Sequence, residues 1–316
     1  MKIKKLLSML LVLVMVLSTF AACGKKEEET NADTTKTVEE NKETEKEEPT
    51  KAPKEEEEVS QGVTDTTIKV GNAAATSGAL AAVGVPFNAG IEAYFKMVND
   101  AGGINGRKIE FVHIDDEFDP VKGKAATETL INDEKVFAIV GHFGTPTIGA
   151  TLDILKETGI PTVYFAAGIA ALYNEDATSV ENGQGLFPVQ PIYVTEGRLM
   201  VARAIEEHQA KKIGVIYTND DAGKDLLAGV ENQVSKLGGD YTVIKEQINP
   251  GATDVSSAVL KMKDENVDVI VAASIQATLP TIIKGLIAQG VSKPVFTTYS
   301  NADATTISNF ANDYAA

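Results

Sequence analysis

The chain alternates between short apolar runs and longer segments in which apolar residues recur with helical spacing. Most of the short runs are continuous and rich in β-branched residues, which is typical of strands covered on both faces. We therefore predict strands at residues 68–74, 108–114, 136–141, 161–167, 186–190, 212–218, 241–248, 267–274 and 294–299.

The segments between these runs carry apolar stripes with the spacing of one helix face. Phe87, Ile91 and Tyr94 belong to one such stripe, and Leu226 and Val230 belong to another. We predict that these stripes pack in the core. Strands that alternate with helices in this order predict βαβ units and parallel sheets.

The strand count divides the folded part into two lobes. Five predicted strands precede a break at residues 187–193 and four follow it, so each half can form a doubly wound sheet. The predicted fold class is α/β, with two doubly wound parallel-sheet lobes joined by a hinge. The first ligand-binding lobe is expected at 64–188 and the second at 189–316. Ligands of such sheets bind beyond the carboxyl ends of the strands, so we expect a cleft where the two lobes face each other.

Residues 1–23 have the pattern of a secretory signal. Early lysines precede an apolar run from Leu6 to Leu17, and small residues follow before Cys23. The run is too short and wrongly flanked for a stable membrane span. Cys23 is the single cysteine of the chain, so it has no partner for an internal disulfide. The residues FAAC, which end at Cys23, resemble the bacterial lipobox, and this resemblance implies that Cys23 is lipidated and becomes the mature N-terminus.

Residues 24–63 are predicted to form a disordered acidic tether. Residues 24–60 hold 14 acidic and 7 basic side chains and almost nothing apolar. Such a segment cannot bury enough surface to offset its ordering entropy. The whole chain has a formal net charge of −16, and no basic patch favours nucleic acid. The predicted location is the extracytoplasmic face of a cell membrane, where the lipid anchor holds the protein.

The stretch FAIVGHFGTPTIGA (137–150) passes from a strand into a helix. We expect Thr145 at the helix N-cap and Pro146 at the first helical position. A helix start offers unpaired N–H groups and partial positive charge, which suit a carboxylate. An ordinary capped helix with nothing bound fits the same residues, so this segment alone leaves both interpretations open.

The stretch VNDAGGINGRKIEFVHIDDEFDP (98–120), followed by FAIVGHFGTPT, resembles the leucine/isoleucine/valine-binding family, the type I solute-binding proteins of ABC importers. The likeness extends from Ile68 to about Asn309. Its most specific element, AGGINGRKI with DDxxDP, implies a helix stop and turn, and then a helix that opens at Asp119–Pro120. The family also continues beyond the point where this sequence stops, so the second lobe is expected to be incomplete at its C-terminus.

The resemblance implies a binding protein rather than an enzyme, with no cofactor. The expected function is that of the solute-binding component of an ABC importer for branched-chain or related amino acids or small carboxylates. Its expected partners are the small-molecule solute, a permease and ATPase complex, and the membrane through the lipid anchor. A ligand-sensing receptor of the same fold is the alternative to a transport component.

The small residues after the predicted strands and the resemblance together place the ligand contacts. Thr145 would take the solute carboxylate through its hydroxyl and N–H. Where this chain has Tyr299–Ser300, the family has an acidic residue that pairs with the solute ammonium. The ligand-binding residues we expect are Ser77, Thr145, Ala166, Gly168, Tyr193, Asp220, Gln276 and Ser300.

The residues of the chain do not form a recognisable catalytic or metal-binding motif. The sequence has no GxSxG elbow, no P-loop, no GxGxxG after a strand and no HExxH. His142 is the one histidine expected near the cleft, where a hydrogen-bonded wall is favoured over a catalyst. The carboxylates of residues 115–117, at a strand end, are compatible with Mg²⁺. No lysine ends a later strand of that lobe as a phosphoacceptor site would need, so no metal site is predicted.

Overall fold

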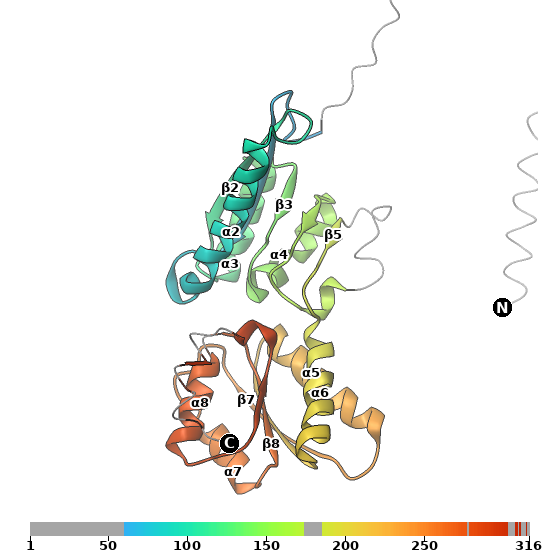
Figure 1. The fold of residues 1–316 in the computed structure, drawn as a ribbon, viewed down its shortest axis with the longest axis vertical. Coiled ribbons are helices and arrows are strands. Elements are labelled where there is room, and N and C mark those ends of the chain that lie inside the picture. Colours follow the sequence, from blue (N-terminus) through green and yellow to red (C-terminus); the bar gives the residue numbers. More distant parts are fainter. Residues whose placement is uncertain are drawn as a thin grey trace, which may run out of the picture. The chain divides into compact units, whose positions relative to one another are not determined.

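The computed structural model describes residues 60–173, 185–276 and 278–302, together with Ile307, Ser308, Phe310 and Tyr314. The predicted signal peptide, Cys23 and the predicted tether up to residue 59 lie outside these residues. The part Glu57–Ala316 is one compact unit, and it contains two parallel sheets (Figure 1). Among the described helices, none is both long enough and apolar enough to cross a membrane.

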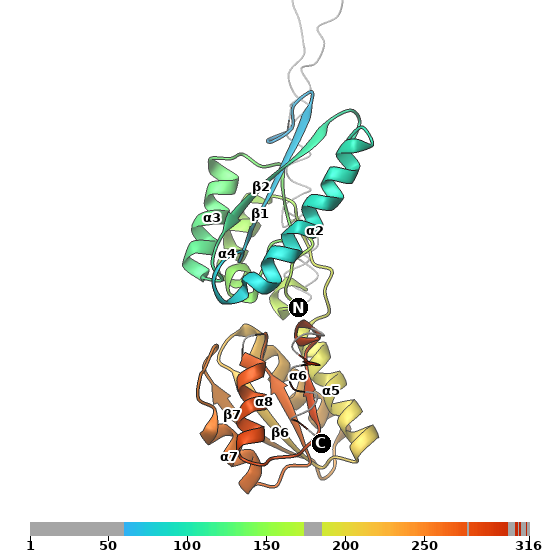
Figure 2. The same cartoon turned by 60° about the vertical axis from the view of Figure 1, so that its left-hand side comes forward.

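The first sheet has five parallel strands in the order β2-β1-β3-β4-β5. They are β1 (Thr67–Ala74), β2 (Lys108–Asp115), β3 (Ala138–Val140), β4 (Thr162–Val163) and β5 (Leu186–Phe187). Figure 2 shows α2 (Ala81–Asp100) on one face of this sheet, and α3 (Pro120–Asn132) and α4 (Thr145–Thr158) on the other. The order reverses between β1 and β3, and a crevice opens at such a point beyond the carboxyl ends of the strands.

The second sheet has four parallel strands in the order β7-β6-β8-β9. They are β6 (Lys212–Thr218), β7 (Thr242–Ile248), β8 (Val269–Ala273) and β9 (Val295–Thr297). Its helices are α5 (Tyr193–His208), α6 (Asp221–Leu237), α7 (Ser256–Asp264) and α8 (Thr278–Ala288). Short 3-10 helices lie at η1 (Gly78–Leu80), η2 (Ala170–Leu172) and η4 (Tyr299–Asn301). The order reverses again, between β6 and β8, so both sheets have the same kind of crevice.

The predicted fold class, α/β with two parallel-sheet lobes, is confirmed, and a strand forms in each of the nine predicted runs. The run 161–167 is the largest departure, because only Thr162–Val163 is strand. Tyr164 has a φ of 59°, which takes the chain out of the sheet toward the segment after β3. The division into domains at 63/64 and 188/189 stays a prediction.

The predicted apolar stripes are core in the second lobe but only partly in the first. Leu226 and Val230 of α6 are fully buried. Ile91 of α2 is buried as predicted, whereas Tyr94 is 60% exposed. Tyr94 lines a groove together with Val140 of β3 and Tyr164, which follows β4, and this groove leaves its side chain exposed.

The two sequence elements that carry the resemblance have the structural roles predicted for them. The segment AGGINGRKI ends α2 and then turns back on itself, with Ile104 and Arg107 paired across the turn. Asp119 is the N-cap of α3, and its carboxylate accepts hydrogen bonds from the N–H groups of Val121 and Lys122 at 2.8 and 3.0 Å. Both elements position strand β2 and helix α3.

Candidate functional site

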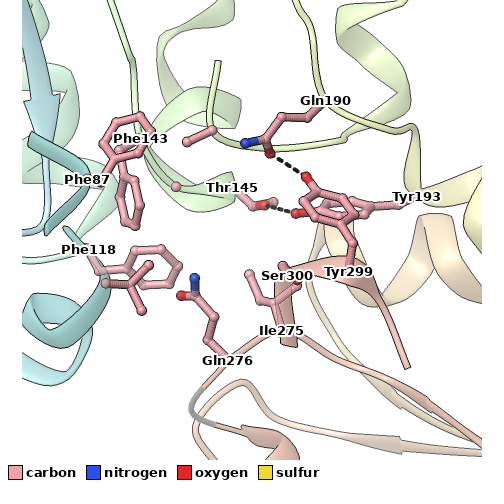
Figure 3. A pocket seen from close by; sticks show the side chains of 13 residues that line it. Phe87, Phe118, Phe143, Thr145, Gln190, Tyr193, Ile275, Gln276, Tyr299 and Ser300 are labelled. Carbon is pink, nitrogen blue, oxygen red and sulfur yellow. Dashed lines mark hydrogen bonds between the residues drawn. The ribbon is translucent and has the colours of Figure 1, made fainter. Parts of the chain in front are cut away.

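A pocket of about 180 Å³ lies where segments that follow the strands of both sheets come together (Figure 3). The first lobe contributes the start of α2 and the segments after β2, β3 and β4. The other side is formed by the chain that leads into α5 and by the segments after β8 and β9. Its lining residues are Val83, Phe87, Phe118, Phe143, Gly144, Thr145, Ala166, Gln190, Tyr193, Ile275, Gln276, Tyr299 and Ser300.

The segment after β3 brings the start of helix α4 to the pocket. Gly144 is the N-cap residue, with a φ of 92°. A Cβ added there would lie 2.7 Å from the ring of Phe118, so both the backbone and the space require glycine. The predicted N-cap at Thr145 is therefore wrong by one residue, because Thr145 is the first residue of α4. The Thr145 hydroxyl makes no capping bond, and it lies 3.5 Å from the hydroxyl of Tyr193.

The start of α4, which no side chain caps, places hydrogen-bond donors at this side of the pocket. The first N–H groups of a helix have no acceptor within the helix, and together they act as a partial positive charge. Thr145 presents its hydroxyl beside them. Thr147 makes a different contact, since its hydroxyl donates to the buried carboxylate of Asp116 at 2.6 Å. Only Thr145 of the two threonines lines the pocket.

Three phenylalanines form an apolar wall in the first lobe. The ring centroids of Phe87 and Phe143 are 5.4 Å apart, and those of Phe118 and Phe143 are 6.4 Å apart. None of the three was among the predicted ligand contacts. Phe118 and Phe143 lie in strand-end segments that the sequence had singled out, so an aromatic residue directly after a predicted strand was the available signal.

The opposite wall is built from two tyrosines, and half-buried polar groups hold the segment of Tyr299 in place. The rings of Tyr193 and Tyr299 stack with centroids 6.2 Å apart, and the Tyr299 hydroxyl donates to Gln190 Oε1. Glu196 of α5 accepts the N–H of Tyr299 at 2.9 Å and the hydroxyl of Thr298 at 2.7 Å. Burial raises the pKa of the Glu196 carboxyl. Burial also raises the pKa of Tyr299, which keeps its hydroxyl neutral and able to donate.

Gln276 supplies a neutral amide at the floor of the pocket (Figure 3). Its backbone has a φ of 44°, and its N–H donates to Asn301 Oδ1. Among the described residues its Oε1 has no hydrogen-bond partner although it is buried. The side chain of Asn301 also donates to the carbonyl of Ser274 at 2.8 Å, so η4 and the segment after β8 hold each other in place.

The structure brings five of the eight predicted contact residues to one pocket. These are Thr145, Ala166, Tyr193, Gln276 and Ser300. Ser77, Gly168 and Asp220 do not line it, and each makes a different contact. The whole list therefore stays a prediction as far as ligand contact is concerned.

The three remaining residues support backbone geometry. The N–H of Ser77 donates to Asp115 at 3.3 Å. A Cβ on Gly168 would lie 2.1 Å from the carbonyl oxygen of Pro191, so glycine permits this close approach. Asp220 is the N-cap of α6 and accepts the N–H of Gly223 at 2.8 Å.

The acidic cluster after β2 is engaged in hydrogen bonds within the chain. Burial raises the pKa of Asp115, but hydrogen bonds from the Ser77 side chain and from the N–H groups of Glu117, Thr76 and Ser77 outweigh it and bring the pKa down to about 2. For Asp116 burial prevails and raises the pKa. The described residues contain no group of three or more His, Cys, Asp or Glu suited to a metal ion.

His142 is buried between β3 and α4 and does not line the pocket. The Thr151 hydroxyl donates to the carbonyl of Thr147 at 3.0 Å, so it can only accept from His142. The 2.9 Å contact is therefore a hydrogen bond from His142 Nε2–H to Thr151. Burial lowers the pKa of His142 to about 4, which leaves it neutral at pH 7.

The family described as periplasmic binding protein matches residues 67–316. An amino acid binding protein of Pseudomonas aeruginosa is 28% identical over 229 residues, which cover 71% of this chain and 58% of that protein. A Leu/Ile/Val-binding protein of Citrobacter freundii is 26% identical over 248 residues, which cover 78% of this chain and 65% of that protein. The chain therefore spans about three fifths of the length of these curated relatives.

A solved structure with the same fold is that of a fatty acid ABC transporter substrate-binding protein from Thermomonospora curvata. It superposes with a TM-score of 0.69 at 25% identity and covers 79% of this chain and 62% of that one. The relatives are named as binding proteins and not as enzymes. Two parallel-sheet lobes and a family match over most of the chain lead to one conclusion: the chain belongs to the type I periplasmic binding proteins of the leucine/isoleucine/valine-binding family, which bind solutes and catalyse no reaction.

Proposed function

We propose that the chain is the extracytoplasmic solute-binding component of an ABC importer and that it binds a branched-chain or related amino acid, or another small carboxylate. The observation that carries this proposal is the open start of α4, where Gly144 has no side chain to cap the helix and the Thr145 hydroxyl faces the pocket. A helix N-terminus with a hydroxyl beside it is suited to a carboxylate. The relatives named for amino acids and for a fatty acid bind solutes that carry this group.

Closure of the two lobes is the proposed binding mechanism. The pocket takes lining residues from segments after the strands of both sheets. A solute that contacts both sides binds the closed arrangement more tightly than the open one, so it shifts the population toward closure. The chain between β5 and α5, which contains Gln190, is the proposed hinge.

The proposed location rests on Cys23, at the end of the predicted signal peptide. A diacylglycerol together with an acyl chain meets the two-signal requirement for stable attachment to a membrane. Substituting Cys23→Ser should remove the lipid and move the protein from the membrane pellet to the soluble fraction. Lipid label on the variant, together with its retention in the pellet, would contradict the anchor.

The carboxylate site is tested with Thr145→Ala, which removes the hydroxyl and keeps the N–H. A hydrogen bond to a charged group contributes about 1.5–3 kcal/mol, so the affinity should fall by about ten- to a hundredfold. The measurement is calorimetric titration with the tightest binder from a thermal-shift screen of amino acids and small carboxylates. The free energy of unfolding without solute should change little, because this hydroxyl makes no capping bond.

Thr147→Ala is the matched control, two positions along the same helix. Its hydroxyl donates to the buried Asp116, and leaving a buried acceptor unpaired costs about 1–3 kcal/mol of stability. The control should therefore unfold more easily and still bind with unchanged affinity. If Thr145→Ala behaves as this control does, Thr145 is structural and the carboxylate binds elsewhere.

A further inference from the structure

The side chains that line the pocket carry no formal charge. Among the described residues the lining consists of an apolar set, Val83, Phe87, Phe118, Phe143, Ala166 and Ile275, and a neutral polar set with Gly144. The polar set comprises Thr145, Gln190, Tyr193, Gln276, Tyr299 and Ser300. The start of α4 adds partial positive charge at one side. An anion therefore finds a favourable partner in this pocket, whereas a cation does not.

The carboxylates of Glu196 in α5 and Asp225 in α6 are already engaged in hydrogen bonds within the chain. Glu196 uses one oxygen to accept the N–H of Tyr299 and the other to accept the hydroxyl of Thr298. Asp225 accepts the N–H of Ala170 at 2.7 Å. Neither carboxylate lines the pocket. An ammonium group enclosed here would have no counter-charge among the described lining residues, and burying an unpaired charge is costly.

Gln276 also supplies no charge that could neutralise an ammonium group. Its Oε1 is a buried acceptor without a partner among the described residues, and its backbone is fixed by the bond to Asn301. A neutral amide can hydrogen-bond a hydroxyl group or an ammonium, but it does not neutralise the charge of the ammonium. The residue therefore offers the solute a hydrogen bond but no counter-charge for an ammonium.

The volume limits the size of the apolar body. A cavity of about 150 Å³ in another protein is large enough to bind benzene, and this pocket has about 180 Å³. The phenylalanine wall of the first lobe gives such a body an apolar surface. A single ring or a short branched chain fits this space together with a carboxylate.

We infer that the pocket selects a carboxylic acid that has a short branched or single-ring apolar body and no ammonium group. This inference rests on the proposed binding of a carboxylate at Thr145. It narrows the proposed solutes to those that lack the amine of an amino acid.

Two matched pairs of compounds test the inference by calorimetric titration of the purified protein. They are 4-methylpentanoate with leucine, and 3-phenylpropanoate with phenylalanine, because the members of each pair differ by the ammonium group. The acid of at least one pair should bind at least tenfold more tightly than its amino acid. Equal or tighter binding of the amino acids would overturn the inference and leave the proposed carboxylate site intact. If no member of either pair binds, both the proposed site and the inference are wrong.

Substitutions that add charge to the pocket make the test sharper. Gln276→Glu changes one neutral amide into a carboxylate of the same shape, so it should shift the preference toward leucine by at least tenfold. Ser300→Asp serves the same purpose if the first variant does not fold. Asp303, the acidic residue that follows Ser300 most closely in the sequence, lies outside the described residues. Asp303→Asn should leave the preference of the protein unchanged, and loss of leucine binding in this variant would contradict the inference.

Discussion

Helices α4 and α6 both begin at the carboxyl end of a central strand, yet of the two only α4 leaves its start open. Each helix follows a strand that borders the reversal in strand order. At α6, Asp220 accepts the N–H of Gly223 at 2.8 Å and the hydroxyl of Thr218 at 2.8 Å, so the chain satisfies its own helix start. At α4 the N-cap is Gly144, which has no side chain to do so. The difference fits the proposed carboxylate site at α4, because a helix start without a capping side chain leaves its N–H groups to an anion.

The largest expected effect comes from Gly144→Ala, at the N-cap of the open start. A non-glycine residue at a φ of 92° is strained, and its Cβ would lie 2.7 Å from the ring of Phe118. Backbone strain and overpacking each cost about 1–3 kcal/mol, so the free energy of unfolding should fall by about 2–6 kcal/mol. Affinity for the solute should also fall. Urea denaturation and calorimetric titration measure the two effects.

Gly90→Ala is the control for this glycine. Gly90 lies inside α2, and a Cβ there would meet no atom within 4 Å. Alanine in a helix interior is more favourable than glycine by about 0.5–1 kcal/mol. The control should therefore be slightly more stable than the parent protein. A similar loss of stability in both variants would show that the geometry of Gly144 is not special.

An intermediate effect is expected from His142, which precedes the open helix start and has no counterpart before α6. Its pKa is about 4 in the folded protein and about 6.5 when unfolded. As the pH falls below 6.5 the unfolded state takes up the proton first, so the stability contributed by the neutral side chain is lost between about pH 6.5 and 4. At pH 5 the loss should reach about 2 kcal/mol.

The measurement is the free energy of unfolding at pH 7.5 and pH 5 for the parent protein and for His142→Gln. Glutamine can donate to Thr151 as His142 Nε2–H does, but it does not titrate. The drop in stability should therefore be about 2 kcal/mol smaller in the variant. Equal drops in the two proteins would assign the acid sensitivity to other groups.

The smallest effect is expected from Asp220→Ala, at the start of α6, where Asp220 is the N-cap. Removing an N-cap carboxylate costs about 0.5–2 kcal/mol, and Asp220→Asn should restore most of this loss because asparagine also caps well. Asp220 does not line the pocket, so neither variant should change the affinity. A change in affinity of tenfold or more in Asp220→Ala would contradict the proposal that the solute contacts the start of α4 and not that of α6.

The sequence predicted the architecture well because strand-length runs and helix boundaries are local features. Asp119–Pro120 opens α3 as expected, since an aspartate followed by proline suits a helix N-cap and first turn. The register of α4 was harder to predict. Each residue along a helix turns the side chain by about 100°, so the N-cap at Gly144 rather than Thr145 decides what the Thr145 hydroxyl faces.

Contacts between distant segments could not be predicted in the same way. The role of Gly168 depends on the carbonyl of Pro191, and this approach between two backbones leaves no pattern in side-chain chemistry. Phe87 shows that a local pattern can be read correctly and still miss a contact with the pocket. Its helical spacing predicted core packing, and the structure places it near the start of α2, where the core meets the pocket.

The bond between Glu196 and the segment after β9 has a consequence for the order in which the protein can form. Glu196 lies near the start of α5, and its partners Thr298 and Tyr299 follow 102 and 103 residues later. As the nascent chain lengthens from its N-terminus, the five strands of the first sheet are present long before these partners. The aromatic wall of the first lobe can therefore assemble early, whereas the tyrosine wall must wait until the last described strand has been made.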